Sequence, residues 1–295
     1  MKPQLYIDFK QCIDQAAHWL RYRSSVVHTS RWQGTDISKM PEMATFEVAN
    51  CSFGVEMSKY DRGVHGLADA MNNAVSDIEP NMPWAEEHFW ERVCGYPVNP
   101  GVQWSKWPYG NKASTFLDDN GKFNHNYMER YWPKYAGFIA NATREPEQIM
   151  GPLHEYRDSN GGVMPRPHHG IKYEYGDLND VVELLAGDEL TRQAYLPIWF
   201  PEDTGGGSKR APCTIGYHFL VRDGRMHINY HIRSCDFVRH FRDDLFLTLR
   251  LVQWVADRLH SLGRDEPLKL GNFYMQIGSL HMFKNDYLQL WGLSR

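Results

Sequence analysis

Cys213 is the residue of this chain with surroundings best suited to nucleophilic chemistry. It lies in KRAPCTIGYHF, just after a glycine-rich turn and at the start of a segment with strand character. Arg210 stands three residues upstream, and Arg233 returns beside Cys213 across a predicted hairpin. Nearby cations lower the pKa of a thiol, and the thiolate is the nucleophilic form. Free cysteines are more often inert core residues, so the assignment depends on the neighbouring motifs.

Two further motifs follow the cysteine. Arg233-Ser234-Cys235-Asp236 brings a guanidinium, a hydroxyl and a carboxylate together at a strand end, which are groups that bind a phosphate. The alternative is a surface salt bridge between Arg233 and Asp236. In RHFRDDLF, Asp244 and the residue before it open a predicted helix, where carboxylates also serve as capping acids favoured by the helix dipole.

A mixture of helices and strands must position these groups. Spacing of apolar residues predicts helices at 8–22, 84–94, 177–186 and 244–262, and strand character at 45–54 and 271–283. The clearest local signal is TIGYHFLVRDGRMHINYHIR, where two strand-like runs flank Asp223-Gly224, a favoured hairpin turn. No linker or repeat divides the chain, so we expect one mixed α/β domain over residues 1–295, with loop insertions near 96–120 and 144–169.

Composition limits the possible partners. The chain has 295 residues and a formal net charge of −4, which disfavours a protein that coats nucleic acid. Its five cysteines contain no CxxC pair, and the first residues lack the apolar run of a signal peptide. No apolar run approaches the length of a membrane span, and the fourteen histidines show no metal-ligand spacing. We expect a cytoplasmic protein with a small-molecule partner, no metal, and no membrane or direct nucleic-acid contact.

The order PCT, hairpin, RSCD, FRDD and a late GSLH resembles the thymidylate synthase superfamily, and within it most closely the phage deoxycytidylate hydroxymethylases. The resemblance is strong for residues 175–285 and loose before them. It implies a three-layer α/β (α+β) fold with a large mixed β-sheet. It also implies a homodimer, located in the host cytoplasm if phage-encoded, in which Arg192 is shared across the interface.

The resemblance assigns catalytic roles to three residues. Cys213 is the nucleophile that adds to C6 of the pyrimidine. Asp244 stands where uracil-specific members have Asn, and a carboxyl can share the proton of cytosine N3 and accept from N4–H. Glu87, three residues before Trp90, corresponds to the carboxylate that moves protons with bound water. Glu86 is the alternative for this role, and either acid could instead be a solvated helix residue.

Substrate and cofactor contacts follow from the same resemblance. The predicted nucleotide-binding residues are Arg31, Tyr127, Arg192, Arg233, Ser234, Asp236 and His281. Two positions depart from the family pattern: Gln193 replaces a second arginine beside Arg192, and Phe283 replaces the tyrosine that reaches the 3′-hydroxyl. Trp104 and Trp107 are candidates to stack on the folate, with core packing as the alternative.

The implied activity is folate-dependent one-carbon transfer. A unit from 5,10-methylenetetrahydrofolate passes to C5 of dCMP through a covalent Cys213 adduct, and water addition gives 5-hydroxymethyl-dCMP. The alternatives are a dCMP C5-methyltransferase, a CMP hydroxymethylase, and a catalytically silent nucleotide- or RNA-binding protein with the same fold.

Overall fold

We describe the protein from a computed structural model. A large mixed β-sheet forms its centre. The model describes residues 4–29, 31–32, 35–62, 66–95, 99–109, 116–123, 125–133, 155–157, 163–165, 176–200, 203–204 and 210–293. The seven strands of the sheet are β1 (Gln4–Tyr6), β2 (Ser25–Val27), β5 (Thr45–Glu56), β8 (Tyr195–Pro197), β9 (Thr214–Arg222), β10 (Arg225–Asp236) and β11 (Lys269–Phe283). The order is β1-β5-β11-β10-β9-β8, with β2 also on β5. The pairs β1–β5 and β10–β11 are parallel and the others antiparallel. The predicted large mixed sheet is confirmed.

The long strands form because apolar side chains alternate with polar ones. In β10, Met226, Ile228 and Tyr230 are buried while the residues between them are partly exposed. The predicted hairpin is confirmed: Asp223 and Gly224 have φ values of 52° and 66°, as a tight two-residue turn requires.

Seven helices accompany this sheet in the described ranges: α1 (Phe9–Arg23), α2 (Leu67–Ile78), α3 (Trp84–Val93), α4 (Tyr127–Tyr131), α6 (Leu178–Gly187), α7 (Phe241–Ser261) and α8 (Lys284–Leu290). The four predicted helices match α1, α3, α6 and α7 to within three residues at each end. Asp177 caps α6 by accepting from the backbone N–H groups of Asn179 and Asp180. None of the described helices has the length and hydropathy of a membrane span.

Short segments complete the described chain. They are the 3-10 turns η1 (Pro41–Met43), η2 (Met57–Asp61) and η3 (Gln103–Lys106), and the paired strands β3 (Arg31–Trp32) with β4 (Thr35–Asp36) and β6 (Glu155–Arg157) with β7 (Val163–Pro165). The predicted insertion near 96–120 contains η3 and lies partly outside the described residues. Of the insertion near 144–169, only β6 and β7 are described.

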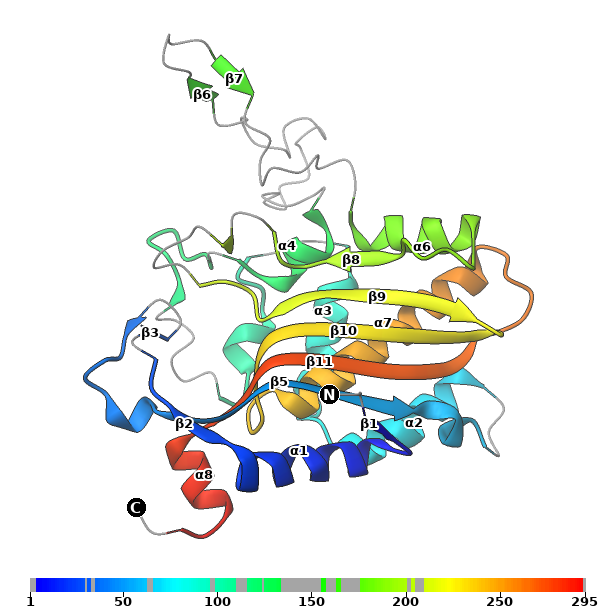
Figure 1. The fold of residues 1–295 in the computed structure, drawn as a ribbon. Helices are drawn as coiled ribbons and strands as arrows, with labels where there is room; N and C mark the ends of the chain where they lie inside the picture. The colour runs from blue at the N-terminus through cyan, green and yellow to red at the C-terminus, as the bar shows by residue number, and fades with distance from the viewer. Residues whose placement is uncertain are drawn as a thin grey trace.

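Helices cover one face of the sheet (Figure 1). Phe9 of α1 packs edge-on against Phe273 of β11, and Phe241 of α7 packs edge-on against Phe53 of β5. Helices α2 and α3 then pack on α7. The sheet, the helices that touch it and the helices behind them give three layers around a core that includes residues from Tyr6 to Tyr287.

The opposite face of the sheet carries no described helix (Figure 1). A groove of about 700 Å³ lies on it across β5, β9, β10 and β11. Its lining includes Ser52, Asn229, His231, Tyr274 and Gln276. Half-buried polar side chains on a sheet face are suited to contact with another polar surface.

Candidate active site

Strand β9 starts, and strands β10 and β11 finish, at the same end of the sheet, which we call the sheet edge. Strand β9 begins directly after Cys213, and the antiparallel β10 ends at the same edge. Because β11 is parallel to β10, its end also lies there, and Asp236 stands opposite His281 in the β10–β11 register. A register irregularity between His231 and Ile232 interrupts the β9–β10 ladder just before this edge. The sheet thus gathers residues that are far apart in sequence.

The environment of Cys213 differs in part from the prediction. The side chain is half-buried and forms no disulfide. Burial raises the pKa of the thiol, while Arg233 lowers it, Asp244 raises it and Arg210 lowers it. The two arginines therefore act in the predicted direction, but the loss of water around sulfur outweighs them. The resting form at neutral pH is the thiol.

Arg233 is held on the chain segment that carries the cysteine. Its Nε donates to the carbonyl of Pro212 and its Nη2 to that of Ala211, both at 2.9 Å. The salt bridge considered between Arg233 and Asp236 does not form within the described residues. Asp236 instead pairs with Arg239 at 2.7 Å. Arg233 is exposed as a residue, so its guanidinium is accessible to an anion.

The end of β11 adds an imidazole and an aromatic ring. His281 Nδ1 lies 3.5 Å from the Ser234 hydroxyl. Phe283, the position that departs from the family pattern, lies under the Arg239 guanidinium, which is 4.7 Å from its ring centre. The predicted residues Ser234, Asp236 and His281 therefore lie together.

Asp244 is a partly buried carboxyl near Cys213. Burial raises its pKa to about 7, although the nearby Arg92 lowers it. Its Oδ2 accepts from Cys235 Sγ at 3.5 Å. The preceding Asp243 accepts from the backbone and side-chain N–H groups of Asn81, both at 2.8 Å. Neither acid caps α7, whose first turn has no side-chain cap.

A hydrogen-bonded chain of hydroxyls links Asp244 to Tyr127. Tyr230 lies close enough to Asp244 to lower the pKa of its carboxyl, and the Tyr230 hydroxyl lies 3.0 Å from the Thr214 Oγ1. That Oγ1 lies 3.4 Å from the Tyr127 hydroxyl. Burial raises the pKa of Tyr127 to about 12. Tyr127, a predicted nucleotide-binding residue, lies beside Thr214, the residue after Cys213, whereas Thr214 and Tyr230 were not predicted as site residues.

Two residues of helix α3 that were not predicted as site residues, His88 and Arg92, lie beside this cluster. The buried Arg92 has its guanidinium 4.2 Å from the Tyr127 ring centre and donates to His88. The sequence could have indicated that Arg92 is buried, because Arg92 follows Phe89 by three residues on the helix face that also buries Ala85. A charged residue on an apolar helix face points to a buried polar partner.

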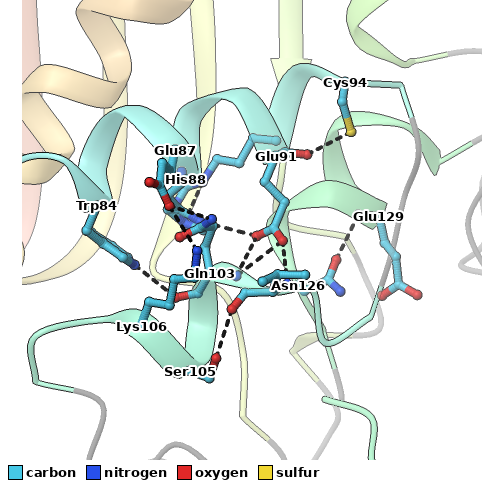
Figure 2. Close-up of polar contacts among 12 residues, drawn as sticks. Trp84, Glu87, His88, Glu91, Cys94, Gln103, Ser105, Lys106, Asn126 and Glu129 are labelled. Carbon is cyan, nitrogen blue, oxygen red and sulfur yellow. Dashed lines mark hydrogen bonds and ion pairs between the residues drawn. The ribbon is translucent and has the colours of Figure 1, made fainter.

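Glu87 lies on the outer side of the same helix (Figure 2). Its side chain is 46% exposed, and its Oε2 accepts from Lys106 at 3.2 Å and Gln103 at 3.0 Å. The ion pair with Lys106 lowers its pKa. The alternative Glu86 is engaged by Arg250. Neither glutamate hydrogen-bonds to the cysteine cluster, so a catalytic role for Glu87 requires a change in its contacts.

The family model for thymidylate synthase matches residues 97–292, which include every site residue above except Asn81 and those of α3. The chain belongs to the thymidylate synthase family.

Three relatives of low sequence identity also carry thymidylate synthase in their names. A thymidylate synthase of Mycoplasma pneumoniae is 24% identical over 192 residues, or 63% of this chain and 56% of the relative. A bifunctional dihydrofolate reductase-thymidylate synthase of Paramecium tetraurelia is 26% identical over 157 residues (49% and 32%). A putative thymidylate synthase of Methanococcoides burtonii is 25% identical over 181 residues (61% and 70%). The matched segment spans little more than half the length of the first relative.

The thymidylate synthase family takes its one-carbon unit from 5,10-methylenetetrahydrofolate. Trp107 stacks on His240 with ring centres 4.7 Å apart. The buried Nε1 of Trp107 and the buried Oε1 of Gln103 have no hydrogen-bond partner among the described residues. Aromatic faces beside unpaired polar atoms fit a flat heterocycle with a polar edge. Trp104 packs edge-on against Phe123, in agreement with the packing alternative.

The two remaining residues predicted to bind phosphate are Arg192, which lies away from Cys213, and Arg31, whose side chain is not described. Arg192 is exposed, and its backbone carbonyl is 3.0 Å from His218 Nε2. The side chain of Arg31 lies outside the described residues. In the described part of the chain, no group of three His, Cys, Asp or Glu side chains has metal-binding geometry.

Proposed function

We propose that this member of the thymidylate synthase family transfers a one-carbon unit to C5 of dCMP and forms 5-hydroxymethyl-dCMP. The observation that supports this most directly is the partly buried carboxyl of Asp244 near Cys213, because the pKa of this carboxyl is raised to about 7. A group that holds or releases a proton near pH 7 suits cytosine, because N3 of cytosine accepts that proton.

Cys213 supplies covalent activation. The thiol loses its proton and the thiolate adds to C6 of the base, which makes C5 a carbon nucleophile. Loss of the thiol proton becomes easier when the base enters, because sulfur then bonds to carbon rather than remaining as a buried anion. Arg233 and Arg210 favour the thiolate in this step.

Asp244 reads the base and changes charge during the reaction. In the free protein, both the protonated and the ionised form of Asp244 are populated near pH 7. Addition at C6 makes N3 more basic, so the proton moves from Asp244 to N3. The resulting carboxylate faces two N–H groups, a charge-assisted pair that strengthens as the adduct forms. Uracil carries N3–H and O4 instead and gains nothing from this transfer.

The sheet edge binds the rest of the nucleotide. Arg233 and Ser234 offer a guanidinium and a hydroxyl to the phosphate, and His281 contacts the sugar. Asp236 fixes the turn after β10 by accepting from the backbone N–H groups of Val238 and Arg239. Arg31 and Arg192 complete the phosphate site in this proposal.

The folate supplies carbon at the oxidation level of formaldehyde when it is bound against Trp107. The overall reaction consumes dCMP, methylenetetrahydrofolate and water, and it yields 5-hydroxymethyl-dCMP and tetrahydrofolate. The C5 proton is lost, water adds its hydroxyl to the transferred carbon, and Cys213 leaves with a proton. Glu87 serves the proton transfers only if its carboxylate leaves Lys106.

The active unit in this proposal is a homodimer. The polar groove across β5, β9, β10 and β11 includes Arg233, so a second copy on this face lies next to the phosphate site. Arg192 is exposed and therefore available to a partner subunit. An isologous contact would give each site an arginine from the other subunit.

Incubation with methylenetetrahydrofolate and each of dCMP, CMP and dUMP tests the proposal by product mass. We expect turnover of dCMP with a product one CH₂O unit heavier than the substrate. A product heavier by CH₂ identifies a methyltransferase. Turnover of CMP or dUMP in preference to dCMP overturns the substrate assignment.

A further inference from the structure

Arg92 is a buried cation in a helix face that otherwise carries apolar residues. Only 6% of the residue is exposed. Its Nε and Nη2 both donate to Nε2 of His88, at 3.0 and 2.8 Å. Burial lowers the pKa of His88 to about 4, so this ring is neutral and supplies no counter-charge. A buried charge without a balancing charge is strongly destabilising.

The balancing charge must come from a carboxylate near the guanidinium. Arg92 lowers the pKa of both Asp243 and Asp244. Asp243 is already engaged by the two Asn81 donors. Asp244 has no cationic hydrogen-bond partner in the described chain, since its contacts are with Cys235 and Tyr230. Glu91 lies on the far side of His88, 3.7 Å from its Nδ1, and already accepts from the backbone N–H groups of Val102 and Gln103. Among the described carboxylates near Arg92, Asp244 is therefore the one without a cationic or backbone donor.

A continuous path joins the two residues. The Arg92 guanidinium lies on the Tyr127 ring at 4.2 Å, a favourable cation–π contact. From Tyr127 the hydroxyl chain runs through Thr214 and Tyr230 to Asp244. Arg92, Thr214 and Tyr230 are buried and Tyr127 and Asp244 are partly buried, so a change of charge at one end of the path acts on the other end with reduced screening by solvent.

We propose that Arg92 is a positioning residue whose buried charge stabilises ionised Asp244 and so helps Asp244 give its proton to N3 of the pyrimidine. The inference rests on the proposed function, because it takes Asp244 as the group that faces the base. His88 holds the guanidinium in place for this role. Arg92 acts on the reaction through Asp244 and Tyr127.

The direction of the effect follows from the groups that face Asp244. They are Arg92 from α3, Asp243 from α7, Cys235 and Tyr230 from β10, Cys213 before β9 and Tyr127 from α4. Among the described residues, Arg92 is the cation that favours ionised Asp244. Removing it raises the pKa of Asp244 above 7. Since the protonated acid binds neutral cytosine, the variant should keep its affinity for dCMP to higher pH but be a weaker acid.

The experiment compares dCMP binding, followed by tryptophan fluorescence from pH 6 to 10, with kcat. In the wild-type protein we expect affinity to fall as pH rises through about 7, and Asp244→Asn should remove this dependence. In Arg92→Met the midpoint should rise by at least about one pH unit. At pH 7 its affinity should be unchanged or better, while kcat falls about tenfold. A merely structural role would weaken binding at every pH and leave the midpoint in place.

Two controls keep the test decisive. Arg250→Met removes another partly buried arginine between α7 and α3 that pairs with Glu86, and its midpoint should match wild type. Arg92→Lys keeps the charge and should hold the midpoint within about half a pH unit of wild type. If Arg92→Met does not fold, a shift of the midpoint in Arg92→Lys as large as one unit overturns the proposal.

Failure of the two proposals can be told apart. If Asp244→Asn binds dCMP with the wild-type pH dependence, the base-reading role of Asp244 is wrong and the inference falls with it. If Asp244→Asn loses that dependence but folded Arg92→Met keeps the wild-type midpoint, only the role of Arg92 is overturned.

Discussion

Arg233 donates its backbone N–H to the carbonyl of Cys213 at 2.8 Å, while its guanidinium holds the carbonyls of the two residues before the cysteine. One residue therefore fixes the position of the thiol and also presents a cation beside it. An anion bound by Arg233 lies next to the thiol without further movement of the backbone.

Cys213→Ala should abolish turnover and leave nucleotide binding in place. The variant loses the only group proposed to add to C6, so we expect kcat to fall by more than about 10⁴-fold. Isothermal titration with dCMP should give an affinity within about threefold of wild type, because the Arg233 contacts to Ala211 and Pro212 are retained. Persisting turnover would exclude the covalent mechanism.

Asp244→Asn should move the substrate preference from cytosine toward uracil. An amide can pair with O4 and N3–H of uracil, whereas it cannot give a proton to cytosine. We expect the ratio of kcat/KM for dUMP to that for dCMP to rise at least about 100-fold. The matched control is Asp243→Asn, which loses charge one residue away and should keep the cytosine preference. An unchanged ratio in Asp244→Asn contradicts our assignment.

Glu87→Gln distinguishes proton transfer from a surface ion pair. For a proton-transfer role we expect kcat to fall about 100-fold with little change in dCMP binding. Lys106→Met removes the ion-pair partner but keeps the acid, and its rate should stay near wild type. A wild-type rate in Glu87→Gln would remove Glu87 from the mechanism.

Arg192 should act in the site of the partner subunit. Cys213→Ala and Arg192→Ala are each expected to be nearly inactive, because each lacks a group in every site. Mixed dimers contain one complete site, so reassociated equal mixtures should recover about one quarter of wild-type activity. Light scattering on the same samples should report dimers. No recovery from dimeric mixtures would place Arg192 in its own subunit's site or outside it.

Asp177→Ala should destabilise the protein without affecting chemistry. The buried Asp177 side chain accepts from two backbone N–H groups at the start of α6. Loss of such a cap costs about 1 kcal/mol in the free energy of unfolding. Urea denaturation measures this loss, and the control Asp177→Asn, which keeps a capping oxygen, should retain most of the wild-type stability. A stability equal to wild type in Asp177→Ala would show that the cap contributes little.

Local patterns were sufficient to predict much of the fold. The helix starting after Asp177 and the turn at Asp223-Gly224 depend on residues adjacent in sequence, and both are confirmed. The grouping of Cys213 with Arg233 also depends on one hairpin. In contrast, the partner of Asp236 was predicted as Arg233 in one alternative, whereas the turn after β10 brings Arg239 to it.

The rest of the site required the assembled structure. The path from Arg92 to Asp244 uses α3, α4, β9, β10 and α7, and no spacing along the sequence connects those elements. The burial of Cys213 is similarly a property of the packed molecule, and it reverses the net direction of the pKa shift that the neighbouring arginines alone would give.

The register between β10 and β11 limits how this gene can change by insertion and deletion. Asp236 stands opposite His281 because the two strands run parallel in a fixed ladder. Deleting one residue from β11 just before His281 would bring Met282 opposite Asp236 and exchange an imidazole for a thioether. Changes of length should therefore be selected against at the carboxyl end of β11, where the loss of a single codon would change the residue opposite Asp236.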